Sequence, residues 1–141
     1  MLKNIDPLFS PELLMHLSAM GHGDELAIVD ANFPASRCAQ RLVRLDGIST
    51  TEALKSIMSV LPLDQYVEKP GSTMAVSEGD SFPEITNEFQ DIIATAGEGE
   101  NTNASIERFE FYRRVEQAYL VVSTGERRLY GNILLKKGVI K

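Results

Sequence analysis

The sequence predicts an α/β domain in which helices cover both faces of a β-sheet. Segments with the composition of strands alternate along the chain with segments that have the period of helices. Several strand segments, "LAIV" and "YLVV" among them, are continuously apolar, whereas a strand with one face in water alternates apolar and polar residues. With 141 residues the chain has the length of one ordinary domain, so we expect a single domain over residues 1–141.

Four segments have the apolar spacing of amphipathic helices. The first begins at Ser10, which can cap it, and Gly21 is expected to end it in a left-handed conformation. The second carries a capping box, because Ser49 is followed three residues later by Glu52. The helices are expected over residues 10–21, 49–61, 82–97 and 110–118.

Six shorter segments are expected to form the strands. They are rich in apolar residues and are bounded by glycine, aspartate and other turn residues. They cover residues 25–31, 41–47, 73–78, 105–109, 119–125 and 132–138. The polar stretches 62–72 and 97–103 contain glycine or proline and are expected to be loops.

The composition argues against several classes of function. The net charge is -6 and the basic residues gather only in short pairs, so nucleic-acid binding is not expected. The one cysteine, Cys38, excludes an intrachain disulfide and a cysteine-rich metal site, and we expect it to fill space in the core. No apolar run approaches the roughly 20 residues of a membrane span, and the N-terminus lacks the pattern of a signal peptide. We therefore expect a cytoplasmic protein that does not bind membranes.

His22 is one of two histidines and lies between Gly21 and Gly23. A histidine near a helix C-terminus is favoured there because its charge meets the helix dipole, which is a purely structural explanation. The functional explanation is that flanking glycines free the backbone and leave accessible a ring that can both donate and accept protons near neutral pH. Position alone does not decide between the two. His16, inside the first helix, is expected to lie at the surface or half-buried.

Other candidate site residues follow an apolar strand or lie on a helix. Asp30 comes directly after "LAIV", at the expected C-terminal end of a strand, where ligands collect in open α/β sheets. Arg108 and Tyr112 are four residues apart and share a helical face if the helix has begun by then, and such a pair suits a polyol. Gly131 and Asn132 interrupt an apolar segment, which indicates a close approach of the backbone to another group. Each also has a structural explanation, as a turn residue or as surface packing.

Motifs of most enzyme classes are missing from the chain. There is no phosphate-cradling glycine-rich loop, dinucleotide fingerprint or HExxH motif, and no GxSxG surrounds Ser123. Two histidines on either side of a helix end make a poor metal pair, so neither a metal nor another cofactor is expected. Cofactor-free proton transfer on a small ligand remains.

Five motifs occur along the chain in this order: "SPELL", "MGHGDE" with "DANFPA", "LPLDQYVE", "ERFEFYRR", and "TGE" with "YGNILLKKGV". Together they resemble the family of L-fucose mutarotases, which is related to the D-ribose pyranases, over about residues 2–139. The resemblance implies a three-layer α/β domain with a mixed β-sheet and helices on both faces. It also implies an isomerase of fucose metabolism that interconverts α and β anomers without a cofactor. Such an enzyme would be a homodecamer with its active sites at subunit boundaries.

The same resemblance assigns roles to individual residues. His22 matches the proton-donating histidine of the family, and Asp30 or a bound water would complete the acid/base pair. The chain carries Asn32 where some bacterial members have histidine, so no role for a second imidazole is expected. The positions that match substrate contacts of the family are Asp30, Asp64, Met74, Arg108, Tyr112, Tyr130, Gly131 and Asn132.

The sequence leaves three alternatives open. A D-ribose pyranase would interconvert pyranose and furanose forms, although "FEFY" and "NILLKKG" look closer to the fucose branch. A non-catalytic sugar-binding protein would have little need of a titrating imidazole. Schiff-base chemistry at Lys136 or Lys137 is the third, although two adjacent lysines are more simply explained as facing solvent.

Overall fold

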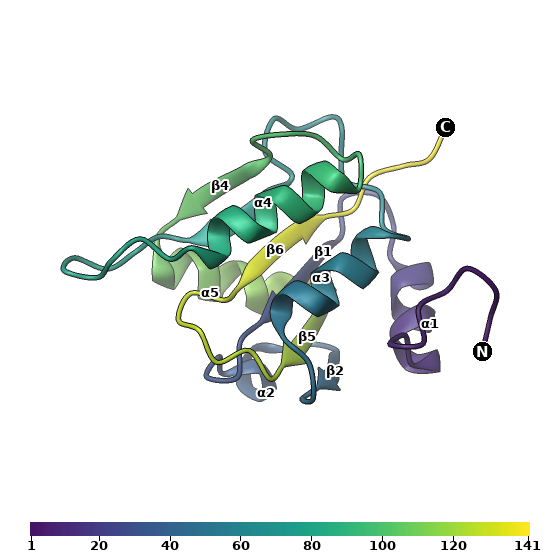
Figure 1. Cartoon of the computed structure of the whole chain (residues 1–141), viewed down its shortest axis with the longest axis horizontal. Helices are drawn as coiled ribbons and strands as arrows, with labels where there is room; N and C mark the ends of the chain where they lie inside the picture. The colour runs from purple at the N-terminus through teal and green to yellow at the C-terminus, as the bar shows by residue number, and fades with distance from the viewer.

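The computed structural model describes residues 1–141 and has one six-stranded sheet surrounded by five helices (Figure 1). The strands are β1 (Glu25–Val29), β2 (Leu42–Leu45), β3 (Gly71–Met74), β4 (Asn103–Ile106), β5 (Leu120–Thr124) and β6 (Ile133–Lys136). The helices are α1 (Pro11–Ala19), α2 (Ala35–Cys38), α3 (Thr50–Met58), α4 (Ile85–Thr95) and α5 (Arg108–Gln117).

The sheet is mixed, as expected, with the strand order β2-β5-β1-β6-β3-β4. Strands β2, β5 and β1 run parallel, β6 is antiparallel to both of its neighbours, and β3 is parallel to β4. Consequently β1, β3 and β4 all end at the edge of the sheet where β6 begins. At the opposite edge β1 and β3 begin and β6 ends.

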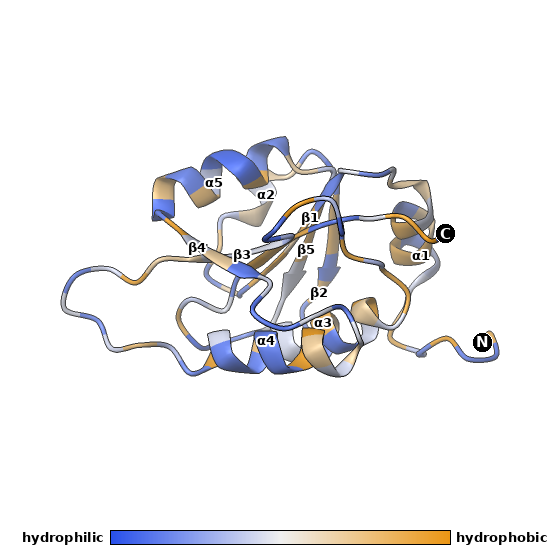
Figure 2. Cartoon of the chain, turned by 90° about the horizontal axis from the view of Figure 1, so that it is seen from above, coloured by the Kyte–Doolittle hydropathy of each residue, from blue (hydrophilic) through white to orange (hydrophobic).

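Helices cover both faces of the sheet, which confirms the predicted layers. Figure 2 shows α2 and α5 on one side of the sheet and α3 and α4 on the other, with α1 beside one end. In β1, Leu26 and Ile28 pack towards α1, α3 and α4, whereas Ala27 and Val29 pack towards α2 and α5. All four side chains are buried, which explains why the strand is continuously apolar.

The expected helix and strand starts are largely confirmed. The capping box forms: Ser49 accepts from the Glu52 backbone N–H, and the Glu52 carboxylate accepts from the Ser49 N–H. Ser10 caps α1 in the same way, through the Leu13 N–H. Cys38 is buried in the core between α2 and α5, as expected of a filler.

Several local expectations were wrong. The left-handed residue after α1 is Gly23, with φ 85°, and Gly21 keeps an ordinary conformation because extended Met20 already ends the helix. Strand β3 begins at Gly71, two residues before the expected start, and α5 begins at Arg108, inside the segment expected to be a strand. The short helix α2 was not predicted, since no side chain caps its start. No helix is long and apolar enough to cross a membrane.

Candidate active site

A pocket of about 250 Å³ opens where β1, β3 and β4 end and β6 begins. This is the position at which open α/β sheets bind ligands, beyond the carboxyl ends of strands. Six of the predicted substrate-binding residues line it and come from four separate segments of the chain: Asp30, Met74, Arg108, Tyr112, Tyr130 and Asn132. The fold therefore gathers most of the sequence-derived set into one place, which we call the sugar pocket after the ligand that the family resemblance implies.

Asp30 is the most firmly held polar residue of the sugar pocket. Its side chain accepts from the Asn32 N–H and from the Asn132 amide, both at 2.9 Å, while the Asn132 side-chain oxygen accepts from the Asp30 N–H at 2.8 Å. Asp30 is only 6% exposed, and this burial raises its pKa above the ordinary value despite the hydrogen bonds. The carboxyl can therefore hold a proton at a higher pH than an exposed aspartate.

The chain approaches β6 through a constrained backbone. Tyr130 has φ 62°, a conformation that costs a residue with a side chain roughly 1–2 kcal/mol. A Cβ on Gly131 would lie 2.7 Å from Cγ of Glu126 and 3.4 Å from Cβ of Asp30, so any other residue would have to displace the Glu126 side chain. The close approach that the sequence indicated at this glycine is confirmed. Tyr130 and Asn132, the neighbours of this glycine, both line the pocket together with Asp30.

Helix α5 contributes the basic and aromatic side chains. Because the helix begins at Arg108, Arg108 and Tyr112 do share a helical face. The Arg108 guanidinium lies over the Phe109 ring, 4.8 Å from its centroid, and forms no hydrogen bond or ion pair within the chain. Its donors are thus free for a ligand, while Met74, which is buried at the end of β3, supplies an apolar surface.

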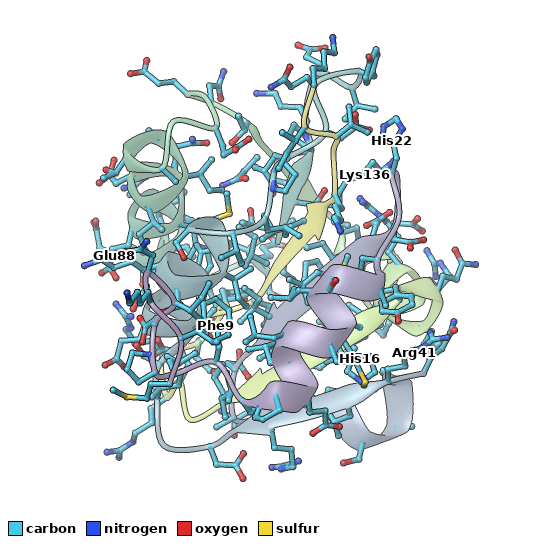
Figure 3. The ribbon with its side chains drawn as sticks, turned by 90° about the vertical axis from the view of Figure 1, so that its right-hand side faces the viewer. Phe9, His16, His22, Arg41, Glu88 and Lys136 are labelled. Carbon is cyan, nitrogen blue, oxygen red and sulfur yellow. The ribbon has the colours of Figure 1, made fainter.

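His22 lies at the opposite edge of the sheet, before β1. Its side chain is 44% exposed, and its Nε2 is 3.0 Å from Oδ1 of Asp64, which is buried. The same Asp64 oxygen accepts from the Tyr66 N–H at 3.0 Å, and the His22 and Tyr66 ring centroids are 5.5 Å apart. Figure 3 shows the imidazole at the margin of the molecule, near the end of β6 that carries Lys136.

Asp64 determines which His22 nitrogen is free. The Tyr66 N–H and the His22 ring hold the pKa of Asp64 below its usual value, so the carboxyl is ionised near neutral pH and can only accept. Nε2 must then carry the proton of the 3.0 Å contact, and Nδ1 is left to exchange protons with a ligand. The sequence had assigned Asp64 to the sugar. In the fold it is the partner that orients His22.

The end of β6 anchors the His22 loop. The Lys137 ammonium donates to the carbonyl oxygens of Leu17 and Met20, at 2.9 and 2.6 Å, which caps the C-terminus of α1. Its backbone bonds to Gly23 and Asp24 on the other side of His22. The Lys137 ammonium is therefore committed to helix carbonyls, contrary to the solvent-facing placement, and it is not free for Schiff-base chemistry.

The two acid/base candidates do not meet within one chain. His22 precedes β1 and Asp30 follows it, and a five-residue strand spans about 16 Å at roughly 3.3 Å per residue. A pyranose ring cannot contact both. Asp30 therefore cannot complete an acid/base pair with His22 inside one chain, because β1 separates the residues at its two ends.

Sequence analysis did not identify every residue of the pocket. Ser77 and Asp80, from the connection between β3 and α4, also line it, as do Asn32 and Phe33. The Gly-Asp pair at 79–80 is typical of a turn, so the position of Asp80 in the pocket is evident only from the fold. Nowhere in the fold do three or more histidine, cysteine or acidic side chains gather in a way that could hold a metal ion.

Comparison with known proteins identifies the family of the chain. The model of the RbsD / FucU transport protein family matches residues 3–140. The chain belongs to this family. Human fucose mutarotase is 43% identical to this chain, and the match covers 99% of this chain and 94% of the human protein. L-fucose mutarotase of Haemophilus influenzae (strain 86-028NP) is 45% identical, over 99% of this chain and 97% of that protein.

Solved structures of the RbsD / FucU family share the fold. The fucose mutarotase of Streptococcus pneumoniae in complex with L-fucose superposes with a TM-score of 0.95 at 44% identity, covering 99% of this chain and all of that one. Bacillus subtilis RbsD complexed with D-ribose superposes with a TM-score of 0.74 at 22% identity over the full length of both chains. The expected three-layer α/β domain is thereby confirmed, and the second likeness concerns the fold alone.

Proposed function

We propose that this chain catalyses the cofactor-free interconversion of the α and β anomers of L-fucose. Relatives named fucose mutarotase, about 45% identical over nearly the whole chain, support the substrate. The observation that carries the chemistry is the sugar pocket, which combines a buried carboxyl of raised pKa, an amide, a free guanidinium and two phenols. These groups suit a neutral ligand rich in hydroxyls.

The reaction needs one proton acceptor and one proton donor. To open the pyranose ring, the O1 hydroxyl loses its proton, the C1–O5 bond breaks with its electron pair on O5, and O5 gains a proton. Closure on the other face of the aldehyde reverses these steps, so both groups must exchange roles. Asp30, whose pKa burial raises, and His22, through Nδ1, are suited to such exchange, which is worth about 10² to 10⁴ in rate.

The remaining pocket residues would hold the sugar. Arg108 donates to hydroxyls, and Tyr112 and Tyr130 cover the apolar side of the ring or bond through their hydroxyls. Met74 contacts the C6 methyl group of the deoxy sugar. Both groups are apolar, so neither loses hydrogen bonds to water when they come together. Asn132 and Gly131 act by fixing Asp30, and the assignment of Asp64 to the sugar remains a prediction of the sequence.

The separation of His22 from Asp30 supports a site shared between subunits. In a closed ring each subunit presents one surface to a neighbour and a different surface to the other neighbour. An exposed His22 of one copy can then reach the sugar pocket of the next, although it cannot reach its own. This is consistent with the homodecamer expected from the sequence, in which each active site would lie at a boundary. Cytoplasmic location also remains a prediction of the sequence.

Proton exchange spectroscopy on the anomeric signals of L-fucose, with and without protein, tests the proposed function. We expect faster α/β exchange on L-fucose than on D-ribose, and loss of the acceleration in His22→Ala. Acceleration on D-ribose alone would make the chain a pyranase. Saturable L-fucose binding without acceleration would make it a sugar-binding protein, and either result would overturn the proposal. Sedimentation equilibrium gives the subunit number, and a monomer would rule out the shared site.

A further inference from the structure

The Tyr130 hydroxyl is held by the connection between β3 and α4, residues 75–84. This connection leaves the body of the domain as an extended loop (Figure 1). The Ser77 N–H donates to the Tyr130 hydroxyl at 3.0 Å, and the hydroxyl in turn donates to the Asp80 carboxylate. All three residues line the sugar pocket. The loop therefore forms one wall of the pocket through Asp80 and Tyr130.

The two carboxyl groups of the pocket differ in the acceptor capacity they have left. Asp30 uses both oxygens for donors of its own chain, the Asn32 N–H and the Asn132 amide. Asp80 receives only the Tyr130 hydroxyl, on Oδ2, and takes part in no ion pair. A carboxylate offers about four lone-pair sites. Asp80 thus has about three acceptor sites left for a ligand, including the whole of Oδ1, whereas Asp30 has about two and already carries a donor on each oxygen.

We propose that Asp80 is a further sugar-binding residue, which accepts a hydrogen bond from one sugar hydroxyl through Oδ1 while Oδ2 holds Tyr130 in place. The proposal rests on the function proposed above and names a specificity contact of the same site. The proton of the Tyr130 hydroxyl is committed to Asp80, so this pair of side chains presents acceptors only. It selects a sugar that carries a hydroxyl at the facing ring position, because an analogue without that hydroxyl leaves the carboxylate unpaired.

The Asp80→Asn variant tests the contact, with Glu78→Gln as its matched control. Both variants remove one negative charge from the same loop, but Glu78 does not line the pocket. We expect Asp80→Asn to raise KM and the calorimetric Kd for L-fucose about 10- to 100-fold, with kcat changed less than about threefold. Glu78→Gln should match the wild type. Equal affinities of the two variants, or a fall in kcat without a change in KM, would overturn the proposal.

Monodeoxy analogues of L-fucose separate direct contact from an effect through Tyr130. Wild-type protein should bind the analogue that lacks the facing hydroxyl about 10- to 100-fold more weakly than L-fucose. The Asp80→Asn variant should discriminate less between that analogue and L-fucose than the wild type does, because a neutral amide forms a weaker hydrogen bond than a carboxylate, while Tyr130→Phe keeps most of the difference. If Asp80→Asn discriminates among all the analogues as strongly as the wild type does, Asp80 does not contact the sugar.

Calorimetry keeps this proposal separate from the proposed reaction. Wild-type protein that binds L-fucose but does not accelerate its exchange would refute the mutarotase function, and the Kd values of the variants would still decide the role of Asp80. Wild-type protein that accelerates exchange while Asp80→Asn binds as tightly as Glu78→Gln would refute the role of Asp80 alone.

Discussion

The two ends of β1 hold their ionisable groups in opposite ways. Asp30, at the C-terminal end, is 6% exposed and fixed by three hydrogen bonds with Asn32 and Asn132. His22, before the N-terminal end, is 44% exposed and has Asp64 as its single hydrogen-bond partner. Burial raises the pKa of Asp30, whereas backbone donation lowers that of Asp64. One end is built as a rigid pocket, and the other presents an accessible imidazole with a fixed tautomer.

Under the proposed function, each end would supply half of an acid/base site. A buried carboxyl can bind and exchange a proton inside a pocket, but it has no partner for the second transfer within its own chain. The imidazole lies outside the sugar pocket of its own chain, so under the proposed function it makes that transfer to a sugar bound by another copy. Variants that remove, recombine or displace these two groups test this division.

The largest expected effect is loss of catalysis when either half is removed. His22→Ala and Asp30→Asn should each slow L-fucose exchange about 10² to 10⁴-fold, because each deletes one proton-transfer group. Since His22 is exposed but donates to buried Asp64, its variant should lose only about 1 kcal/mol of unfolding free energy and remain folded. Exchange spectroscopy and urea unfolding measure the two quantities.

Mixed oligomers decide whether the two halves come from different copies. Co-expression of differently tagged His22→Ala and Asp30→Asn chains, purified through both tags, should recover roughly a quarter of wild-type activity in a shared-site ring with random order. That is the fraction of sites that pair an intact His22 with an intact Asp30. Mixed oligomers as inactive as their parents would place both groups in one chain.

A smaller loss is expected when the anchor of the imidazole is cut. Lys137→Met keeps the backbone bonds to Gly23 and Asp24 but removes the ammonium from the end of α1. We expect kcat for L-fucose to fall roughly 10- to 100-fold with little change in KM, because a displaced His22 loses its alignment. His22 keeps its contacts with Asp64 and Tyr66, and Lys136, whose charge acts on Asp64, is also unaltered.

Lys69→Met is the control for this prediction. Lys69 also donates to a main-chain carbonyl, that of Asn101, but it contacts neither His22 nor the sugar pocket. Its variant should keep wild-type kcat. If both lysine variants lose activity equally, or if Lys137→Met changes only KM, the anchoring role is wrong.

Two glycines compare the tolerance of the two ends. A Cβ at Gly138 would lie 2.2 Å from the backbone oxygen of Leu63, which cannot move without shifting Asp64, whereas a Cβ at Gly131 would mainly meet the Glu126 side chain. We expect alanine to lower the unfolding free energy by about 3 kcal/mol at Gly138 and about 1–2 kcal/mol at Gly131.

The two glycine substitutions should also affect different kinetic constants. Gly138→Ala should reduce kcat through His22 and Asp64, and Gly131→Ala should raise KM through Asp30. Gly47→Ala, where a Cβ meets nothing within 4 Å, is the control and should unfold like the wild type or slightly later. Urea unfolding that is equally affected at all three glycines would contradict the close approaches.

The sequence predicted the composition of the site better than its geometry. Asp30, Arg108, Tyr130 and Asn132 were identified from motifs, and they line one pocket because each follows or precedes a strand at the same edge. The separation of Asp30 from His22 could have been predicted. The two residues are eight positions apart, and an extended strand between them keeps them from meeting. Closeness along the chain suggested that the two residues pair, but the rise per residue of the strand prevents it.

Other features could not be read from local patterns. The buried faces of the sheet and the capping box follow from apolar spacing and side-chain chemistry within a few residues. In contrast, the pairing of His22 with Asp64, 42 residues later, depends on how β6 aligns both segments. The place of Asp80 in the pocket likewise depends on a tyrosine 50 residues away. Such contacts form only in the tertiary structure and cannot be predicted from short windows of sequence.

The smallest expected effect is on the pH dependence of stability, where the two ends should have opposite signs. The raised pKa of Asp30 means that the folded state holds its proton more tightly, so ionisation costs stability as pH rises above about 4. Asp64 has a lowered pKa, so its contribution is present above about pH 4 and is lost as pH falls below that value.

Urea unfolding of the wild type, Asp30→Asn and Asp64→Asn over a pH series at one protein concentration measures both contributions. With rising pH the wild type should lose stability relative to Asp30→Asn and gain it relative to Asp64→Asn, each in its own range. Because both variants exchange a carboxyl for an amide of the same shape, each serves as the control for the other. Differences that move in the same direction would mean that the two carboxyls occupy similar environments, and the division into a buried pocket and an accessible imidazole pair would fail.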